Sequence, residues 1–515
     1  MRKTLFIAIS LLIESLACLS QEPLDSMGFR FQERYRRNFS VLTNVALDKE
    51  RVPEYGRVQL DYTQDKGAFR KAQQAFNQRN IRFYTEGWSQ LKRFRLAGKF
   101  MFNKQVEDSL SNNLRSDQDP LAPFYYFAGK AGNYNRQNYK ADVLIAYDLL
   151  PERLAPLIKL DYQTHWTTGS VDPRPDIKIF TLKYKPGFMW SHSGHKLEVN
   201  GIFGHSLQEI SIDYKNRDFK NSLRFPERIH YLNLGYGYAS IKDSSSMRKY
   251  RKYLGGELAY SKAWANLDVQ MQLEYEHIRE ESTHDFKSRK VYAIRDRFDM
   301  DAYKLNLLLD KRGAKYQQQW RVSASYKSGY DGARDFSPNL QRVNYEVFQQ
   351  HMNIDYRISW QPGASREQEL GARVGYQRLS QQDYAQGNGL DAAGFSFGLH
   401  LNSYWKDKQR NRYILHLSPF YYKPGEVELS MQENAINPFT RQVIFTDYYY
   451  KKTHVLGTEL GLEYIAAAWI KGVPMGLYGQ YQGLFRLNKE TITLEGARDV
   501  GTRRDQFNLG LRLYL

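Results

Sequence analysis

The chain has 515 residues, a formal net charge of +18, 15% aromatic residues and a mean hydropathy of −0.66. This length allows several ordinary domains or one large β-barrel. The basic residues are scattered through alternating segments, and no finger, phosphate-binding loop or helix-turn-helix spacing is present, so we expect no nucleic acid partner. A composition that is both aromatic and polar favours amphipathic strands over buried helices.

The first 20 residues have the organisation of a secretory signal peptide. Arg2 and Lys3 precede an apolar stretch from Leu5 to Leu19, which is too short for a membrane span. We expect residues 1–20 to be removed on export from the cytoplasm of a Gram-negative bacterium. A lipoprotein cysteine at Cys18 is the alternative. If Cys18 is removed, the mature chain has no cysteine for disulfides or thiolate metal sites.

Residues 21–56 are rich in Arg and Glu and precede the first segment with strand periodicity. They are too short for the large plug domain of an energised receptor. We expect a periplasmic N-terminal extension, with a short insert into a barrel lumen as the alternative. The barrel itself is expected over residues 57–515.

Beyond residue 56 the apolar residues recur at every second position. The segments 267–275, 316–327, 352–360, 395–402 and 507–515 show the pattern. Such strands have one apolar and one polar face. Many runs reach about ten residues, which a tilted strand needs to cross a bilayer, whereas sandwich strands are typically about half as long. No stretch approaches the roughly 18 apolar residues of a transmembrane helix.

Short and long connections alternate along the chain, as in membrane barrels with short periplasmic turns and long outer loops. Short connections are expected at 90–92, 149–156, 191–194, 262–265, 310–313, 361–365, 406–410 and 471–472. Longer ones are expected at 64–80, 104–138, 168–176, 215–252, 279–297, 328–345, 378–393, 423–452 and 487–502. The strand-like segment 229–241 would break this alternation. We therefore expect it to be a hairpin of an outer loop that projects beyond the membrane.

The alternation predicts an all-β protein with a single closed antiparallel transmembrane β-barrel. It should have about 18 strands, within a range of about 14 to 20, with both ends on the periplasmic side. The terminal strand should close the barrel against the first strand near Arg57 to Tyr62, because closure leaves no unpaired edge in the lipid. The aromatic clusters 124–127, 420–422 and 448–450 fit interfacial girdles, with ordinary loop packing as the alternative.

The segment EGWSQLKRFR, residues 86–95, is followed by Gly98, Phe100 and Phe102. It resembles the first hairpin of a family of uncharacterised bacteroidete outer-membrane β-barrels. The resemblance extends plausibly over the whole mature chain. It implies an outer-membrane location and a single-barrel fold, and it implies no catalytic residue. One departure is Leu515, at a position where outer-membrane proteins commonly have an aromatic residue.

The sequence predicts no catalytic, cofactor or metal site. His192 and His195 flank Ser-Gly, a dipeptide that is common in turns, and no further metal ligand can be named. Asp117 and Asp119 lack the glycine and terminal glutamate of a calcium loop. The inward-phase histidines have no identifiable serine partner and orienting acid; they are His165, His400 and His416. We therefore expect that the protein is not an enzyme, with a lipid-modifying enzyme as a minor alternative.

Basic residues on the inward phase are expected to line the lumen. They are Arg93, Arg95, Lys99, Arg321, Lys327, Arg357, Arg373, Arg486 and Arg512. About 18 strands leave an aqueous channel unless a loop or the N-terminal segment folds in. A surplus of Arg and Lys raises the local concentration of anions.

We therefore expect an outer-membrane channel or transport component for small hydrophilic solutes, with a mild preference for anions. The alternatives are a surface interaction or structural barrel that has a plugged lumen and acts with a partner, and a secreted soluble β-rich binding protein. The expected partners are outer-membrane lipid and lipopolysaccharide, the barrel-assembly machinery during insertion, and a small solute. The pattern leaves the solute and the oligomeric state open.

Overall fold

The computed structural model describes most of the chain beyond residue 53. The described residues are 45, 54–116, 121–220, 222–237, 239–241, 245–284, 296–334, 341–363, 365–433, 436–470 and 473–515. The expected signal peptide, Asp117, Asp119 and the turn 471–472 lie outside them. Of the expected extension 21–56, the structure describes Val45 and residues 54–56.

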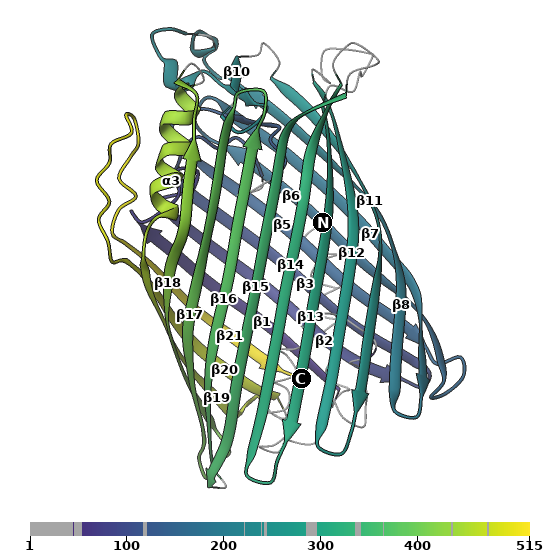
Figure 1. The fold of residues 1–515 in the computed structure, drawn as a ribbon. Helices are drawn as coiled ribbons and strands as arrows, with labels where there is room; N and C mark the ends of the chain where they lie inside the picture. Colours follow the sequence, from purple (N-terminus) through teal and green to yellow (C-terminus); the bar gives the residue numbers. More distant parts are fainter. Residues whose placement is uncertain are drawn as a thin grey trace.

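Eighteen strands of the described chain form one closed antiparallel sheet, as predicted (Figure 1). They are β1 (Tyr55–Gly67), β2 (Asn77–Leu91), β3 (Phe94–Leu110), β5 (Gly132–Tyr147), β6 (Leu154–Gly169), β7 (Arg174–His192), β8 (His195–Asp213), β11 (Ser246–Ala263), β12 (Leu267–His284), β13 (Asp296–Arg312), β14 (Tyr316–Arg334), β15 (Gln341–Gly363), β16 (Arg366–Asp383), β17 (Asn388–Lys406), β18 (Arg412–Ser430), β19 (Val455–Ile470), β20 (Val473–Arg486) and β21 (Arg503–Tyr514). Each of these strands pairs with the next one along the chain.

The last strand closes the barrel against the first. The β1–β21 ladder runs from Arg57 opposite Tyr514 to Gly67 opposite Arg504. Beyond its end, the Gly56 N–H donates to the Leu515 carbonyl oxygen at 2.7 Å, and the Leu515 N–H returns a bond to Gly56 at 2.8 Å. The predicted seam is therefore confirmed, and it removes the strand edges that an open sheet would leave unpaired.

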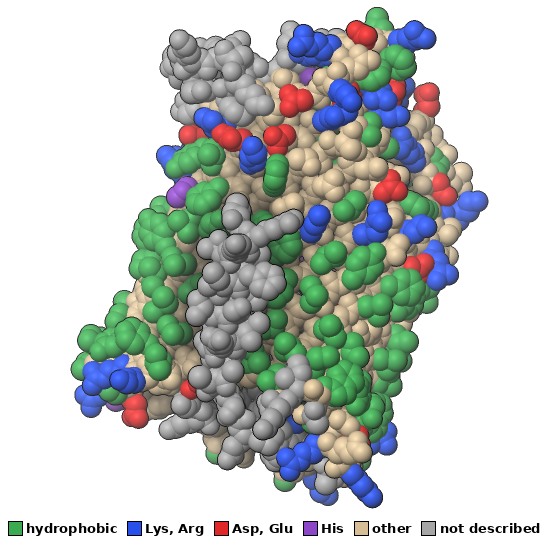
Figure 2. All heavy atoms as spheres, turned by 180° about the vertical axis from the view of Figure 1, so that it is seen from behind, with side chains coloured by type: hydrophobic (Ala, Val, Ile, Leu, Met, Phe, Trp, Pro, Cys, Tyr) green, Lys and Arg blue, Asp and Glu red, His purple; other side chains and the backbone are tan. Residues whose placement is uncertain are grey.

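The apolar face of each strand points outward. Leu60 on β1 is 49% exposed and Leu509 on β21 is 64% exposed, whereas the alternating Gln59 and Asp61 are buried. On the face shown in Figure 2, hydrophobic side chains cover the middle and lower part, and charged side chains gather towards the two ends. This orientation rules out a sandwich, whose apolar side chains would meet in a closed interior. Among the described residues, no helix has the length and apolarity to cross a bilayer.

The long connections lie at one end of the barrel and the short turns at the other (Figure 1). The turn between β7 and β8 is the predicted one, with Ser193 and Gly194 at φ of 50° and 78°, a backbone conformation that favours glycine. The long connections also hold β4 (Tyr125–Phe127), β9 (Tyr231–Asn233), β10 (Ala239–Ile241), the 3-10 helices η2 (Arg217–Phe219) and η3 (Pro226–Arg228), the π-helix η5 (Thr440–Ile444) and α3 (Phe445–Lys451).

Several strands run further into the expected outer loops than the alternation indicated. The predicted long loop 378–393 is wrong: β16 ends at Asp383 and β17 begins at Asn388, so a four-residue connection remains. The physical reason is that the apolar residues change sides at the outer ends of the strands. On β17, Leu390 and Ala392 are buried on the inward face, which further down the strand is polar.

Candidate functional site

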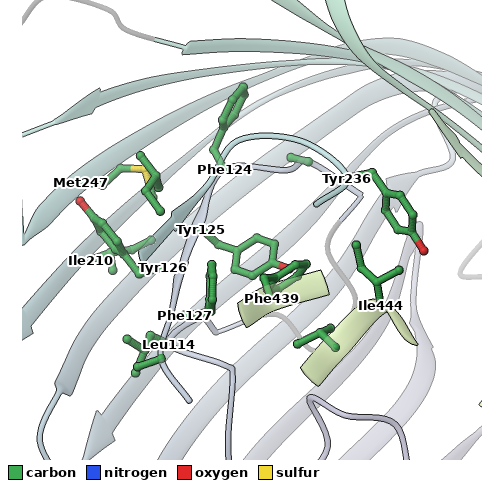
Figure 3. Close-up of a cluster of buried hydrophobic side chains, with 14 of the residues drawn as sticks. Leu114, Phe124, Tyr125, Tyr126, Phe127, Ile210, Tyr236, Met247, Phe439 and Ile444 are labelled. Atoms are coloured by element: carbon green, nitrogen blue, oxygen red, sulfur yellow. The ribbon is translucent and has the colours of Figure 1, made fainter. Parts of the chain in front are cut away.

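Three long connections fold together inside the outer end of the barrel, where they form a buried apolar cluster that we call the mouth core. They are 111–131 with β4, 214–245 with β9 and β10, and 431–454 with η5 and α3. Tyr126 and Leu232 are completely buried in this cluster. The Phe127 ring lies 5.3 Å from that of Tyr231. It lies 4.6 Å from that of Phe439, and Figure 3 shows these two rings together. The mouth core therefore joins all three connections.

This packing corrects two predictions. The segment 229–241 does lie in an outer connection and does contain a hairpin, but β9 pairs with β4 and buries Leu232 instead of projecting outward. The cluster 124–127 is wrong as an interfacial girdle, because all four side chains are buried in the mouth core. Ordinary loop packing, the alternative, accounts for it.

The barrel wall supplies the other half of the mouth core. Ile177, Ile210, Met247, Phe298 and Val347 are buried inward-facing residues near the outer ends of five strands. The signal in the sequence is the inverted alternation at these ends. On β7, for example, Ile177 and Ile179 are buried and Lys178 points away, whereas lower on the same strand the apolar positions are the exposed Phe180 and Tyr184.

Hydrogen bonds hold the mouth connections to one another. Asp172, between β6 and β7, accepts a bond from the Asn216 N–H at 2.9 Å, and its carbonyl accepts one from Arg228 at 3.0 Å. Burial alone would raise the pKa of the Asp172 carboxyl, but backbone N–H donors and the Arg174 guanidinium hold that pKa below its usual value. The carboxylate's part of this anchorage is therefore present at neutral pH and is lost as the pH falls through the lowered pKa, whereas the bond to the backbone carbonyl does not titrate.

Below the mouth, buried ion pairs join strands β6 to β12 along one side of the inner wall. The Lys159 ammonium lies 2.6 Å from Glu198 and also contacts Glu257. Lys185 lies 3.0 Å from Glu274. The Val45 N–H donates to the Glu198 carboxylate at 3.2 Å, so this residue of the N-terminal segment lies in the lumen. Charges at this level satisfy one another, as buried charges must.

The sequence-predicted lumen residues fall into three groups. Seven lie on the inward phase of their strands: Arg95, Lys99, Arg321, Lys327, Arg357, Arg373 and Arg512. Arg486 lies at the outer end of β20, where its guanidinium pairs with Asp499 of the β20–β21 connection at 2.7 Å. Arg93 lies in the exposed turn between β2 and β3, outside the lumen.

The structure brings Arg357, Arg373 and Arg512 to one polar cavity of about 330 Å³, lined by strands β15 to β21. The same cavity holds a serine, histidine and acid arrangement that sequence reasoning missed. The Ser418 Oγ lies 2.8 Å from His400 Nδ1, and His400 Nε2 lies 3.2 Å from an Asp355 oxygen.

The chemistry of this group is that of a packed polar network. Asp355 is shared with Arg357 at 2.6 Å and Arg373 at 3.1 Å, so two cations already neutralise its charge. Ser418 and His400 are both buried, which leaves little access for a substrate. The described residues contain no group of three or more metal-ligating side chains.

The closed strand ladder, the apolar outer face and the charged lumen define the class: a transmembrane-type antiparallel β-barrel with outer connections packed inside its mouth. Within this class, the chain belongs to a family of unknown function (DUF6850), whose model matches residues 45–515. No curated protein matches the sequence.

Solved structures with a similar outline include three outer-membrane proteins. The ferric preacinetobactin receptor BauA from Acinetobacter baumannii is 10% identical with a TM-score of 0.43, over 90% of this chain and 80% of that one. The copper transporter OprC is 10% identical with a TM-score of 0.42, over 90% and 80%. The outer membrane transporter YddB from Escherichia coli is 9% identical with a TM-score of 0.39, over 90% and 81%. At these values, their substrates say nothing about this chain.

Proposed function

We propose that this protein is an outer-membrane β-barrel that passes small hydrophilic solutes, with a mild preference for anions, through a lumen that is closed at its outer mouth in this state. In this proposal the chain is exported by its signal peptide from the cytoplasm of a Gram-negative bacterium. The barrel-assembly machinery inserts it among outer-membrane lipid and lipopolysaccharide. The proposal assigns no chemical reaction to the chain.

The observation that carries the proposal is a polar, charged inward face that leads up to the mouth core. A polar, charged inward face suits the passage of a hydrated solute, and buried charges are costly unless they are paired. Arg373 keeps 47% of its side chain exposed within the polar cavity, so a cation is presented to a solute there. The mouth core is the barrier that such a solute must pass.

Planar-bilayer conductance of a mouth-shortened variant tests the proposal. Strands β8 and β11 pair directly, so residues 216–244 can be replaced by a short Gly-Ser linker without separating them. We expect this variant to conduct far more than the wild-type barrel, because it removes Leu232 and the rest of the β9–β10 hairpin from the mouth core. The matched control replaces residues 384–386, an exposed turn outside the mouth core, and should leave the conductance unchanged.

Heat-modifiable migration in detergent gels checks that each variant is a folded barrel. A folded, mouth-shortened barrel that never conducts would remove the transport proposal.

The second candidate function would then stand, namely an interaction or structural barrel that acts with a partner. The extensive apolar packing of the mouth core favours it, because a permanently filled mouth needs such packing. Loss of a co-purifying partner on shortening the connection would support it.

A further inference from the structure

Three cations lie on the outward phase of neighbouring strands near the outer end of the barrel. They are Lys66 on β1, Arg79 on β2 and Lys104 on β3, and all three are exposed. Arg79 lies opposite Val106, which is two residues beyond Lys104. Lys66 lies opposite Asn77, which is two residues before Arg79. Long side chains at such diagonal positions can reach the same group, so we call the three cations the basic patch.

The charges of the basic patch are not neutralised within the protein. Among the described residues, neither Arg79 nor Lys104 forms an ion pair. The Lys66 ammonium lies 5.9 Å from the centroid of the Phe76 ring, where the ring attracts the cation without removing its charge. All three side chains can therefore act on an anion outside the barrel.

Two carboxylates share the outward phase next to the basic patch. Asp505 lies opposite Lys66 and pairs with Arg503 at 2.8 Å. Asp108 lies opposite Asn77 near the outer end of β3. The three cations of the patch, together with Arg503, outnumber these two carboxylates. The surplus of positive charge favours an anionic ligand.

An apolar groove of about 1210 Å³ lies on the outer face next to the basic patch. Its lining includes the exposed side chains of Tyr62 and Ile81. Gly479 lies between Leu462 and Leu509 in the strand ladder, and because glycine has no side chain the surface is hollowed there. A groove of this kind on the outward face of a membrane barrel meets the acyl chains of the surrounding lipid.

One row of paired residues connects the groove to the basic patch. Along this row, each residue lies opposite the next in the order Gly479, Leu509, Tyr62, Ile81 and Lys104. Strands β1 to β3 lie on the far side of the barrel in Figure 1, which is the face seen in Figure 2, where Lys and Arg side chains lie above a hydrophobic area. A single ligand can therefore contact the cations and the groove together.

We propose that the basic patch and the groove bind a phosphorylated lipid with several acyl chains, of the lipid A type. Phosphate oxygens accept charge-assisted hydrogen bonds from Arg79 and Lys104, and acyl chains lie along the groove. The patch lies at the end of the barrel that has the long connections, which indicates the outer leaflet. The inference rests on the outer-membrane location in the proposed function and does not depend on transport.

Equilibrium binding of lipid A to the full-length barrel, folded in detergent and followed by native mass spectrometry, tests the inference. We expect saturable binding of lipid A, much weaker binding of dephosphorylated lipid A, and no competition by inorganic phosphate, which lacks the acyl chains. The double variant Arg79→Gln/Lys104→Gln should bind lipid A roughly 25-fold more weakly, because each basic residue beside an anionic lipid contributes about fivefold.

The matched control is Lys408→Gln/Arg410→Gln, which removes one lysine and one arginine from the exposed turn between β17 and β18 at the opposite end of the barrel. It should leave the affinity for lipid A unchanged. A loss as large as that of the patch variant would place the headgroup in the periplasmic leaflet and overturn the inference.

A second variant tests the groove. Gly479→Leu should weaken lipid A binding several fold, because the new side chain fills the hollow, where its Cβ would meet the flexible Leu509 side chain at 3.3 Å. Gly98→Leu is the control, because this glycine of β3 lies outside the groove lining and its Cβ would meet the Asp142 carbonyl oxygen at an ordinary 3.6 Å. Equal affinities of the two glycine variants would overturn the assignment of the groove.

Heat-modifiable migration checks that each variant is folded. The inference is also overturned if lipid A does not saturate the wild-type barrel, or if dephosphorylated lipid A binds as tightly. A dimer of the barrel that Gly479→Leu disrupts would assign the groove to a second copy of the chain instead. Conductance of the mouth-shortened barrel is a separate measurement. Conduction without lipid A binding removes only this inference, and lipid A binding without conduction removes only the transport proposal.

Discussion

Arg373 differs from the other arginines of the polar cavity in how much of its side chain is exposed. Its exposed fraction is 47%, against 13% for Arg357 and 15% for Arg512. Arg357 contacts both Asp355 and Glu369, whereas Arg373 contacts Asp355 at 3.1 Å. Arg373 is therefore the cation of this cavity that is best placed to act on a passing solute.

We expect Arg373→Gln to lower the ratio of anion to cation permeability of the mouth-shortened barrel by a few fold, because one exposed lumen charge changes the local concentration of both ions. Reversal potentials in a salt gradient measure the ratio. Arg93→Gln removes the same charge from an exposed turn outside the lumen and should leave the ratio unchanged. An equal effect of both substitutions would show that net charge, and not position, sets the preference.

Single inward residues could be predicted from the sequence wherever the alternation is regular. Arg357 and Arg512 follow that phase, and Arg93 departs from it because the turn begins before it. The contact between His400 and Ser418 could not be predicted, since it depends on how β17 and β18 are paired around Pro419. The ladder is interrupted there, between Gly398 opposite Phe420 and Leu401 opposite Leu417. The two-residue period of a strand determines the face on which each side chain lies, but it does not determine which residues meet across neighbouring strands.

At the scale of elements, α3 links two outer connections. Tyr449 on α3 is buried, and its hydroxyl accepts the backbone N–H groups of Thr493 and Leu494 at 2.9 and 3.2 Å. These two residues belong to the β20–β21 connection, which has no regular secondary structure from 487 to 502. One side chain therefore holds the helix against a long irregular segment.

We expect Tyr449→Phe to make the connection 487–502 more sensitive to trypsin, because two backbone N–H groups lose their acceptor and the segment opens more often. The rate of cleavage after Lys489 or Arg498 in the folded barrel measures this. Tyr448→Phe is the control on the neighbouring residue, whose hydroxyl accepts a long bond from the Lys452 ammonium at 3.5 Å. Equal cleavage rates in both variants would show that the Tyr449 hydroxyl does not hold the connection 487–502 in place.

The outer elements were harder to predict than the wall. Loop alternation correctly predicts that the hairpin 229–241 lies in an outer connection, but it does not predict the direction of the hairpin, because an isolated hairpin carries no signal of what covers it. The apolar residues that cover it, such as Ile210 and Met247, belong to other strands. Their inverted phase is visible in the sequence only once the membrane-spanning part of each strand is known.

At the scale of the whole molecule, the outward apolar face is the property on which a membrane location depends. We expect Leu509→Arg to lower the free energy of unfolding from lipid bilayers by about 2–4 kcal/mol, the cost of a basic residue on the lipid face near the middle of the membrane. Urea titration of the barrel folded into vesicles measures it.

The control for Leu509→Arg uses the same exchange in an outer connection. Leu223 is 91% exposed and lies between β8 and β11, so Leu223→Arg should cost almost nothing. If both substitutions cost the same, the outward face of β21 does not meet lipid. That result would count against the membrane location and the transport proposal together.

The global architecture was accessible from the sequence because one rule governs every strand. Alternation, loop parity and closure together gave the closed barrel and its strand number, and the ladder between β1 and β21 confirms them. The mouth core was not accessible, since its members, such as Tyr126, Leu232 and Phe439, come from segments with no common period.

The seam between β1 and β21 also determines which step of barrel assembly comes last. All other neighbouring barrel strands of the described chain are consecutive in the sequence, so each pair can form as a local hairpin. The seam must join two distant segments, and this step carries the largest entropic cost of loop closure. Until this step, a nascent barrel is therefore a curled sheet with two unpaired edge strands, β1 and β21.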